Sequence, residues 1–287
     1  MIDISEQLSR QMSAYDYCRD KVALPGSSLY YSLLFVPPAL RTSLTALHAA
    51  AEEFREVVDE CSDESIARAK LGWWAEEMQR ACAGQARHPV AQALAVALHQ
   101  SDVDAERFDR VLLASSEHLR RDAYATLAEL ESHYECVADI TGCMAAQFCG
   151  YQDPVTVQVS RELGAGLALA SLVSHPQQKG GRRDTDLPRE ILTECGATSA
   201  DLSASHTAPA LKKTLAIVAE RARTRLQAFL QQMPEADRDA QRNRRALAEM
   251  AMAQLDAVER ADFAVLEEPR AVTPLRKLWI AWKHRRP

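Results

Sequence analysis

The sequence predicts an all-α protein, and three observations support this. Helix-forming residues (Ala, Leu, Glu, Arg and Gln) dominate the chain of 287 residues. Apolar residues recur at spacings of three and four, and no stretch keeps the period-two alternation of a half-buried strand. Only 10 Gly and 12 Pro are spread along the chain, and there is no clean repeat or low-complexity linker. We therefore expect residues 1–287 to form one helical domain.

Breaking and capping residues indicate where the first helices begin and end. Residues 5–22 are expected to form a helix that the segment LPGSS ends. Ser27 and Ser28 can cap a short second helix, which Pro37-Pro38 stops. Residues 38–60 then carry apolar side chains at helical spacing, which predicts a long third helix.

The rest of the chain continues in the same style. Further helices are expected at 65–82, 89–100, 104–121, 124–149, 154–174, 208–233 and 239–262. Residues 176–207 are rich in Gly, Ser, Thr and Asp and form the longest irregular segment. We expect this segment to be a loop over one mouth of a helical bundle.

Composition and charge restrict the class of protein. Hydrophobic residues make up 47% of the chain and charged residues 26%, which suits a soluble protein with a large core. The net charge of −6 argues against a nucleic-acid partner. The seven Cys show no zinc spacing, so we expect reduced thiols in a cytoplasmic compartment. The N-terminus lacks the apolar core of a signal peptide, and prolines interrupt the uncharged run 22–40, so no membrane span is expected there.

The stretch VVDECSDES, residues 57–65, is the first candidate for chemistry. Asp59 and Asp63 are four residues apart, so on one helix both carboxylates would face the same way, with Glu60 beside them. Paired carboxylates suit Mg²⁺, which completes its octahedron with water and substrate phosphates. The alternative is a solvated acidic helix end, with Ser62 or Ser65 capping the next helix.

The residues around this motif resemble the squalene/phytoene synthase family, in the right order over nearly the whole chain. The stretches that carry the resemblance are Ser27-Ser28-Leu29-Tyr30, Val36-Pro37, Arg41, Ala46-Leu47-His48-Ala49, Val58 to Glu64, Trp74 with Glu77, HPVAQAL at 88–94, YATLAELESHYECVADITG at 124–142 and TPLRKLWIAW at 273–282.

The resemblance implies an isoprenoid (terpenoid) synthase bundle of helices around a central cavity. It also implies an Mg²⁺-dependent prenyltransferase that joins two farnesyl or geranylgeranyl diphosphates head to head. Asp59 and Asp63 would then be the catalytic carboxylates and, with Glu60, the metal ligands. Tyr30 and Arg41 would contact the diphosphate or line the pocket.

The second acidic motif of the family is missing from this sequence. In the register that Leu163-Gly164 and Leu187-Pro188 set, His175 and Lys179 occupy the two Asp positions. Ser171 replaces the Asn and Ser174 replaces the Arg of the family motif. Pro176 should end the helix at this point. A lysine in place of a carboxylate repels a divalent ion, so we do not expect the usual metal arrangement.

Other residues of this segment could take over part of the lost role. Lys179, Arg182 and Arg183 could hold a diphosphate directly as cations, or simply form a solvated basic loop. Asp184 and Asp186 could act as displaced carboxylates, although an Asp-x-Asp beside two arginines is also typical of a turn.

The altered motifs are similar to those of one branch of the family, which contains the mitochondrial assembly factor of respiratory complex I. The acidic helix without a double Asp, the basic loop and the close at Gly196 to Leu202 carry this likeness. It implies a non-catalytic role, in which the protein binds an isoprenoid or another lipid, or assists assembly with a protein partner.

The C-terminal segment PLRKLWIAWKHRRP combines apolar and basic residues. Leu275, Leu278, Trp279 and Trp282 fall on one helical face, with Lys and Arg around them. This pattern suits peripheral contact with a membrane surface. The alternative is a final helix that packs on the core and ends in a frayed basic tail.

Overall fold

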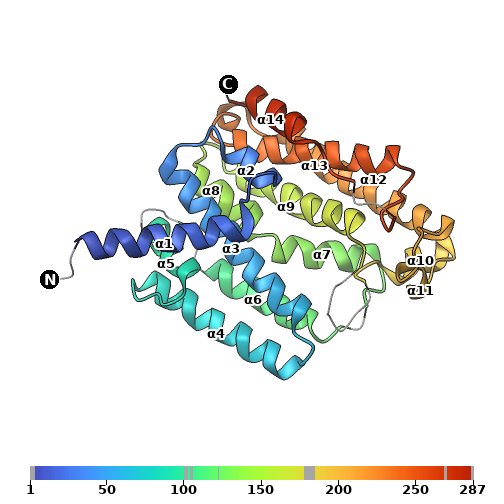
Figure 1. The fold of residues 1–287 in the computed structure, drawn as a ribbon, viewed down its shortest axis with the longest axis horizontal. Helices are drawn as coiled ribbons and strands as arrows, with labels where there is room; N and C mark the ends of the chain where they lie inside the picture. Colours follow the sequence, from blue (N-terminus) through green and yellow to red (C-terminus); the bar gives the residue numbers. More distant parts are fainter. Residues whose placement is uncertain are drawn as a thin grey trace.

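The computed structural model describes residues 4–99, 103, 106–121, 123–177, 185–267 and 270–285. Within these residues the secondary structure is helical throughout, which confirms the all-α prediction. Figure 1 labels the helices as follows: α1 Ile4–Val22, α2 Ser28–Leu33, α3 Pro38–Glu60, α4 Glu64–Cys82, α5 Pro89–His99, α6 Glu106–His118, α7 Leu127–Val137, α8 Ala145–Cys149, α9 Val155–Ser174, α10 Arg189–Cys195, α11 Ser199–Leu202, α12 Pro209–Gln232, α13 Arg242–Arg260 and α14 Pro274–Lys283.

Local sequence signals set several of these boundaries. Ser27 caps α2, because its hydroxyl accepts the Tyr30 N–H at 3.1 Å, as the sequence predicts. Pro38 begins α3 at a position where its missing N–H costs nothing. Gly196 ends α10 with a φ of 71°, a left-handed conformation that favours glycine.

Two expectations about the helices need correction. The predicted helix over 124–149 is divided into α7, a π-helical turn at Ile140–Met144 and α8. The predicted loop 176–207 contains α10 and α11, since Pro188 and Thr198 supply helix starts within it.

The helices pack around two main apolar clusters. One cluster joins α1, α3, α4, α5 and α6, where Phe54 is fully buried between the rings of Trp74 and Phe108. The other joins α7, α9, α12 and α13. Figure 1 shows α9 in the middle of the molecule, beside α7 and α13.

Helix α9 approaches the end of α7 at a glycine. A Cβ built on Gly164 would lie 2.8 Å from both the Cβ and the carbonyl oxygen of Ala138, which is closer than real Cβ contacts. The backbone oxygen cannot swing away as a flexible side chain could. Gly164 is therefore needed for the packing of α9 that positions the interior of the bundle.

Gly164→Ala is expected to destabilise the protein by about 1–3 kcal/mol, because the added methyl group overpacks this crossing. Gly72→Ala on α4 is the matched control, since nothing lies within 4 Å of the Cβ it would add. We expect that control to stabilise the protein by up to about 1 kcal/mol. Urea unfolding midpoints of the two variants measure the difference, and equal midpoints would contradict the close approach.

Candidate functional site

The first acidic motif is not on one helix. Helix α3 ends at Glu60, and Cys61 is extended (φ −88°, ψ 108°). Asp63 is the N-cap of α4 and accepts hydrogen bonds from the N–H groups of Ser65 (2.8 Å) and Ile66 (3.2 Å). The expected shared helical face of Asp59 and Asp63 is therefore wrong, because the chain turns between them. The cap is Asp63 itself, rather than Ser62 or Ser65.

Asp59 belongs instead to a stripe along α3. His48, Glu52, Arg55 and Asp59 are spaced by four, three and four residues, so they share one face of the helix. The Arg55 guanidinium donates to both Glu52 oxygens, at 3.0 and 2.6 Å, and to the Asp59 carboxylate. The hydrogen bonds to Glu52 raise the pKa of Arg55. Burial opposes ionisation of Glu52, but the hydrogen bonds from Arg55 outweigh it and lower the pKa of Glu52.

The two ends of this stripe lie toward α13 and α7, while Arg55 between them is exposed. Burial, and then the positive charge of Arg244 on α13, lower the pKa of His48 to about 4. Burial raises the pKa of Tyr134 on α7, and the carboxylates of Asp186 and Asp59 raise it further. His48 at one end of the stripe therefore interacts with a charge on α13, and Asp59 at the other end interacts with a side chain on α7. None of the four stripe residues is fully buried.

A cluster of polar and aromatic side chains lies where Asp59 acts on Tyr134. The Tyr134 hydroxyl donates to Asp186 Oδ2 at 3.5 Å, and His118 Nε2 lies 3.7 Å from Asp186 Oδ1. His118 also hydrogen-bonds the Tyr124 hydroxyl and stacks on His133, with ring centroids 4.4 Å apart. Asp186 is therefore a buried member of this cluster rather than part of an exposed turn.

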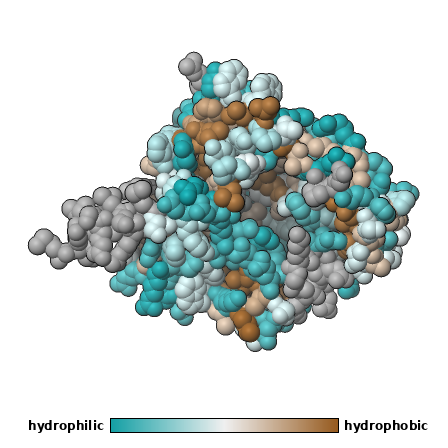
Figure 2. All heavy atoms as spheres, viewed as in Figure 1, coloured by the Kyte–Doolittle hydropathy of each residue, from teal (hydrophilic) through white to brown (hydrophobic). Residues whose placement is uncertain are grey.

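One face of the C-terminal half of α9 is not covered by neighbouring helices, although α9 is central and its other residues there are buried. Leu167, Ala168 and Ser174 are half-buried, and Ser171 is exposed. Figure 2 shows the surface hollowed over this part of α9, with apolar surface inside the depression. We call this depression, defined by Leu167, Ala168, Ser171 and Ser174, the hollow. It is an apolar recess near the predicted position of the second acidic motif.

The helix that carries the altered second motif ends where Pro176 predicts. Helix α9 stops at Ser174, with His175 as its C-cap and Pro176 immediately after. The side chains that α9 presents in this region are Ser171, Ser174 and His175, and none of them is a carboxylate. Lys179, Arg182, Arg183 and Asp184, for which the sequence predicts diphosphate contacts or substitute carboxylates, lie outside the described residues.

The described residues do not fit the multi-carboxylate magnesium site of the sequence prediction. Asp59 lies on the stripe along α3, Glu60 faces the outer surface and Asp63 caps α4. Over the described ranges, no group of three His, Cys, Asp or Glu side chains could hold a metal ion. Glu60 and Asp63 line one recess, but Asp59 is not among its lining residues, so the three predicted ligands do not share one site.

The two predicted pocket residues of the N-terminal region make local contacts. Arg41 Nη2 donates to the carbonyl oxygens of Leu34 (3.1 Å) and Val36 (3.0 Å), which closes the turn between α2 and α3. Tyr30 meets the ring of Tyr31 edge to face, with centroids 5.2 Å apart. The geometry thus gives Arg41 a structural role in this turn.

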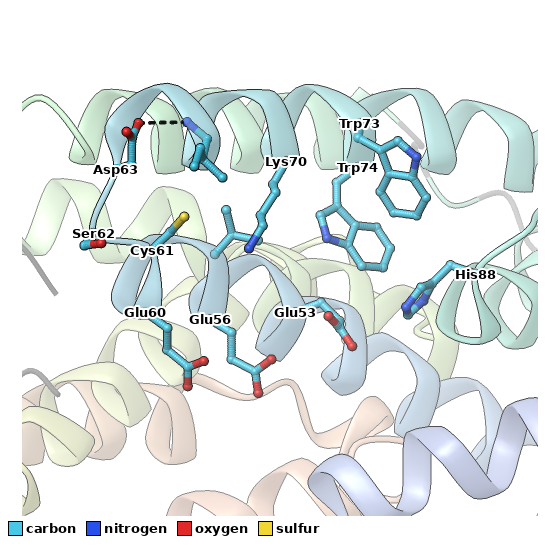
Figure 3. Close-up of a pocket in the computed structure, with 12 residues that line it drawn as sticks. Glu53, Glu56, Glu60, Cys61, Ser62, Asp63, Lys70, Trp73, Trp74 and His88 are labelled. Atoms are coloured by element: carbon cyan, nitrogen blue, oxygen red, sulfur yellow. Dashed lines mark hydrogen bonds between the residues drawn. The ribbon is translucent and has the colours of Figure 1, made fainter. Parts of the chain in front are cut away.

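A second recess lies on the outer side of α3 and α4 (Figure 3). It has a volume of about 500 Å³ and is lined by Glu53, Glu56 and Glu60 of α3 and by Lys70 and Trp73 of α4. Lys21 of α1 neutralises part of the acidic wall, since its Nζ lies 3.0 Å from Glu53 and 2.7 Å from Glu56. No sequence pattern indicates this recess, because it depends on how α1, α3 and α4 pack.

The comparisons with known proteins agree with this architecture. A solved dehydrosqualene synthase in complex with a ligand superposes with a TM-score of 0.80 over 97% of this chain and 98% of that chain, at 17% identity. Presqualene diphosphate synthase of Sinorhizobium fredii is 23% identical over 260 residues, which cover 90% of this chain and 93% of the relative. Complex I assembly factor 6 of Rattus norvegicus is 20% identical over 186 residues.

The extent of these matches differs. The match to the assembly factor covers 64% of this chain and 56% of the relative, so the chain spans about half the length of that protein. The sequence model described as squalene/phytoene synthase matches residues 22–277, which is most of the chain. The protein therefore belongs to the squalene/phytoene synthase family.

Proposed function

We propose that this protein binds an isoprenoid diphosphate, such as farnesyl or geranylgeranyl diphosphate, with its tail in the hollow. The observation that carries the proposal is the uncovered face of the C-terminal half of α9, where Ser171 is exposed on a helix that runs through the centre of the bundle. A helix in that position is normally packed on all sides. The recess over it is a site for an apolar chain.

The two ends of the site suit the two parts of such a ligand. Leu167 and Ala168 supply apolar surface, and each buried methylene of a tail contributes about 0.8 kcal/mol. The polar end contains Tyr134, a hydroxyl donor, and Arg55, whose guanidinium can exchange a carboxylate for a phosphate oxygen. We propose Lys179, Arg182 and Arg183 as further contacts of the diphosphate, on the charge of their side chains alone.

We further propose that the protein does not carry out the family's metal-assisted chemistry at the usual rate. When bound, Mg²⁺ neutralises a departing diphosphate and so lowers the barrier to ionisation. Among the described residues, the carboxylates of Asp59 and Asp186 lie near Tyr134, whereas the end of α9 offers Ser171, Ser174 and His175. Binding by the tail does not need the ion, so we expect affinity to be indifferent to Mg²⁺.

Ala168→Phe is expected to weaken the binding of farnesyl diphosphate at least tenfold, because the ring takes up space that the tail needs. Titration calorimetry with the wild type and the variant, each with and without Mg²⁺, measures this. Ala69→Phe, on an exposed position of α4, is the matched control and should leave the affinity unchanged. Unaltered binding by a folded Ala168→Phe protein would place the tail elsewhere.

A second candidate function is assistance in the assembly of a respiratory complex. The observation that favours it is the similarity to complex I assembly factor 6. The test is deletion of the gene, followed by native gel analysis of complex I and complementation. If the wild type restores complex I but Ala168→Phe does not, assembly requires the open hollow, and the two proposed functions depend on the same site. Normal complex I in the deletion strain would eliminate the second candidate.

A further inference from the structure

Helix α14 carries a row of large apolar side chains on its outer face. Leu275, Leu278, Trp279 and Trp282 are spaced by three, one and three residues, so they form one stripe. Their exposed fractions are 79%, 40%, 59% and 50%. Large apolar side chains gathered in this way on a surface mark an interaction site.

The opposite face of α14 holds the helix in place. Ile280 and Ala281 are buried in a cluster with Ala246 and Met250 of α13, and Tyr31 of α2 packs against it. Lys283 and His284 both bond the Glu249 carboxylate, at 2.7 and 2.8 Å. Burial opposes ionisation of Glu249, but these hydrogen bonds outweigh it and lower its pKa to about 2. The sequence leaves a final helix packed on the core as the alternative to membrane contact. The structure confirms that packing for this face of α14 only.

Cations surround the outer stripe. Lys283 Nζ lies 5.7 Å from the centre of the Trp279 ring, and the Arg285 guanidinium lies 3.5 Å from that of Trp282. The sequence from 272 to 287 contains five Lys and Arg residues and no Asp or Glu, in a chain whose net charge is −6. Indoles with adjacent cations are typical of the boundary between lipid headgroups and acyl chains.

The start of α14 lies beside the hollow. Gln254 of α13 accepts from the Val272 N–H just before α14 (3.1 Å) and donates to Ser174 of the hollow (3.5 Å). Lys277 donates to the Gly26 carbonyl (2.8 Å), next to the exposed Leu24. Figure 2 shows apolar surface gathered over α2 and α14, next to the depression. No described helix is long and apolar enough to cross a bilayer.

We propose that α14 docks the protein on the surface of an anionic membrane, with its indoles among the headgroups and the hollow close to the bilayer. The docking stands on the stripe and its cations. Its purpose, the uptake of an isoprenoid lipid from the membrane, rests on the proposed function. A bilayer fits better than a protein partner, because anionic headgroups complement the net positive charge of residues 272–287, even though Lys283 pairs with Glu249 and Arg276 with Asp256.

The test is co-sedimentation of the full chain with vesicles of phosphatidylcholine alone and with 30% phosphatidylglycerol. We expect binding to the anionic vesicles, weakened by salt, with a blue shift of tryptophan fluorescence. Leu275→Ser with Trp279→Ser should reduce binding at least tenfold. Both side chains are exposed, so the double variant should keep the melting temperature of the wild type to within a few degrees.

The control is Trp73→Ser, which removes an exposed indole that lies on α4 and not on α14. It should bind vesicles as the wild type does. The proposal is overturned if the wild type does not bind anionic vesicles, or if the double variant binds them as tightly as the wild type does. Either result would favour a protein partner for the stripe. Vesicle binding is measured without isoprenoid and isoprenoid binding without vesicles, so failure of either proposal is seen separately.

Discussion

Replacing Arg244 with alanine is expected to lower the free energy of unfolding by about 3–5 kcal/mol, since it breaks a buried polar network at its centre. Arg244 is among the largest fully buried side chains of the protein, at 1% exposure. Its Nη1 donates to Ser160 (2.8 Å) and Gln241 (2.7 Å), and its Nη2 donates to the Gly142 carbonyl (2.9 Å).

The size of this effect follows from what the substitution leaves behind. Three buried acceptors on α9, the π-helical turn and the start of α13 lose their donor, and each unsatisfied group costs about 1–3 kcal/mol. The removed side chain also leaves a cavity beside the Phe229 ring, whose centre lies 5.3 Å from the guanidinium. Burial already lowers the pKa of Arg244 to about 10, so part of the loss is offset by relief of that desolvation.

Denaturant unfolding of Arg244→Ala and Arg242→Ala measures the difference. Arg242 lies two residues away, is half-buried and bonds the exposed Asp239 at 2.8 Å, so its loss should cost about 1 kcal/mol or less. The unfolding midpoint of Arg244→Lys should fall between those of the two alanine variants. The lysine ammonium keeps the positive charge but cannot make the same set of hydrogen bonds as the planar guanidinium. Similar midpoints for Arg244→Ala and Arg242→Ala would contradict the role assigned to this network.

The fold could be predicted from the sequence because its determinants are local. Apolar spacing located the long helices, and Ser27, Pro38 and Pro176 marked boundaries that the structure confirms. The ordered motifs identified the family, since they extend over nearly the whole chain. The prediction of one loop over 176–207 missed the helices α10 and α11. These helices are too short to show a clear apolar periodicity in the sequence.

The site was harder to predict, because its residues meet only through tertiary packing. Asp59 and Asp63 looked like one pair, but a two-residue break gives them different tasks. Asp186 looked like a turn residue until Tyr134 and His118, more than fifty residues away, were placed beside it. Arg55 could have been found, because it lies four residues before Asp59 and so shares a helical face with it.

The second large effect concerns the release of pyrophosphate. A carboxylate about 5 Å from a divalent ion contributes about 3 kcal/mol per unit of ion charge at an effective dielectric constant of about 20. At about 1.4 kcal/mol for each tenfold change, the loss of the carboxylates on α9 lowers the rate of metal-assisted ionisation by about 10⁴-fold or more. We therefore expect no Mg²⁺-dependent turnover in a protein that still binds the substrate.

The most direct measurement is pyrophosphate release from farnesyl and geranylgeranyl diphosphate by the purified wild type and by Asp59→Asn, with and without Mg²⁺. Calorimetry on the same samples shows that the ligand is bound. We expect bound ligand and the same background release of pyrophosphate from both proteins, with and without Mg²⁺. Release that requires Mg²⁺ and disappears in Asp59→Asn would contradict this expectation, because a single carboxylate, alone or with Asp186, would then suffice for catalysis.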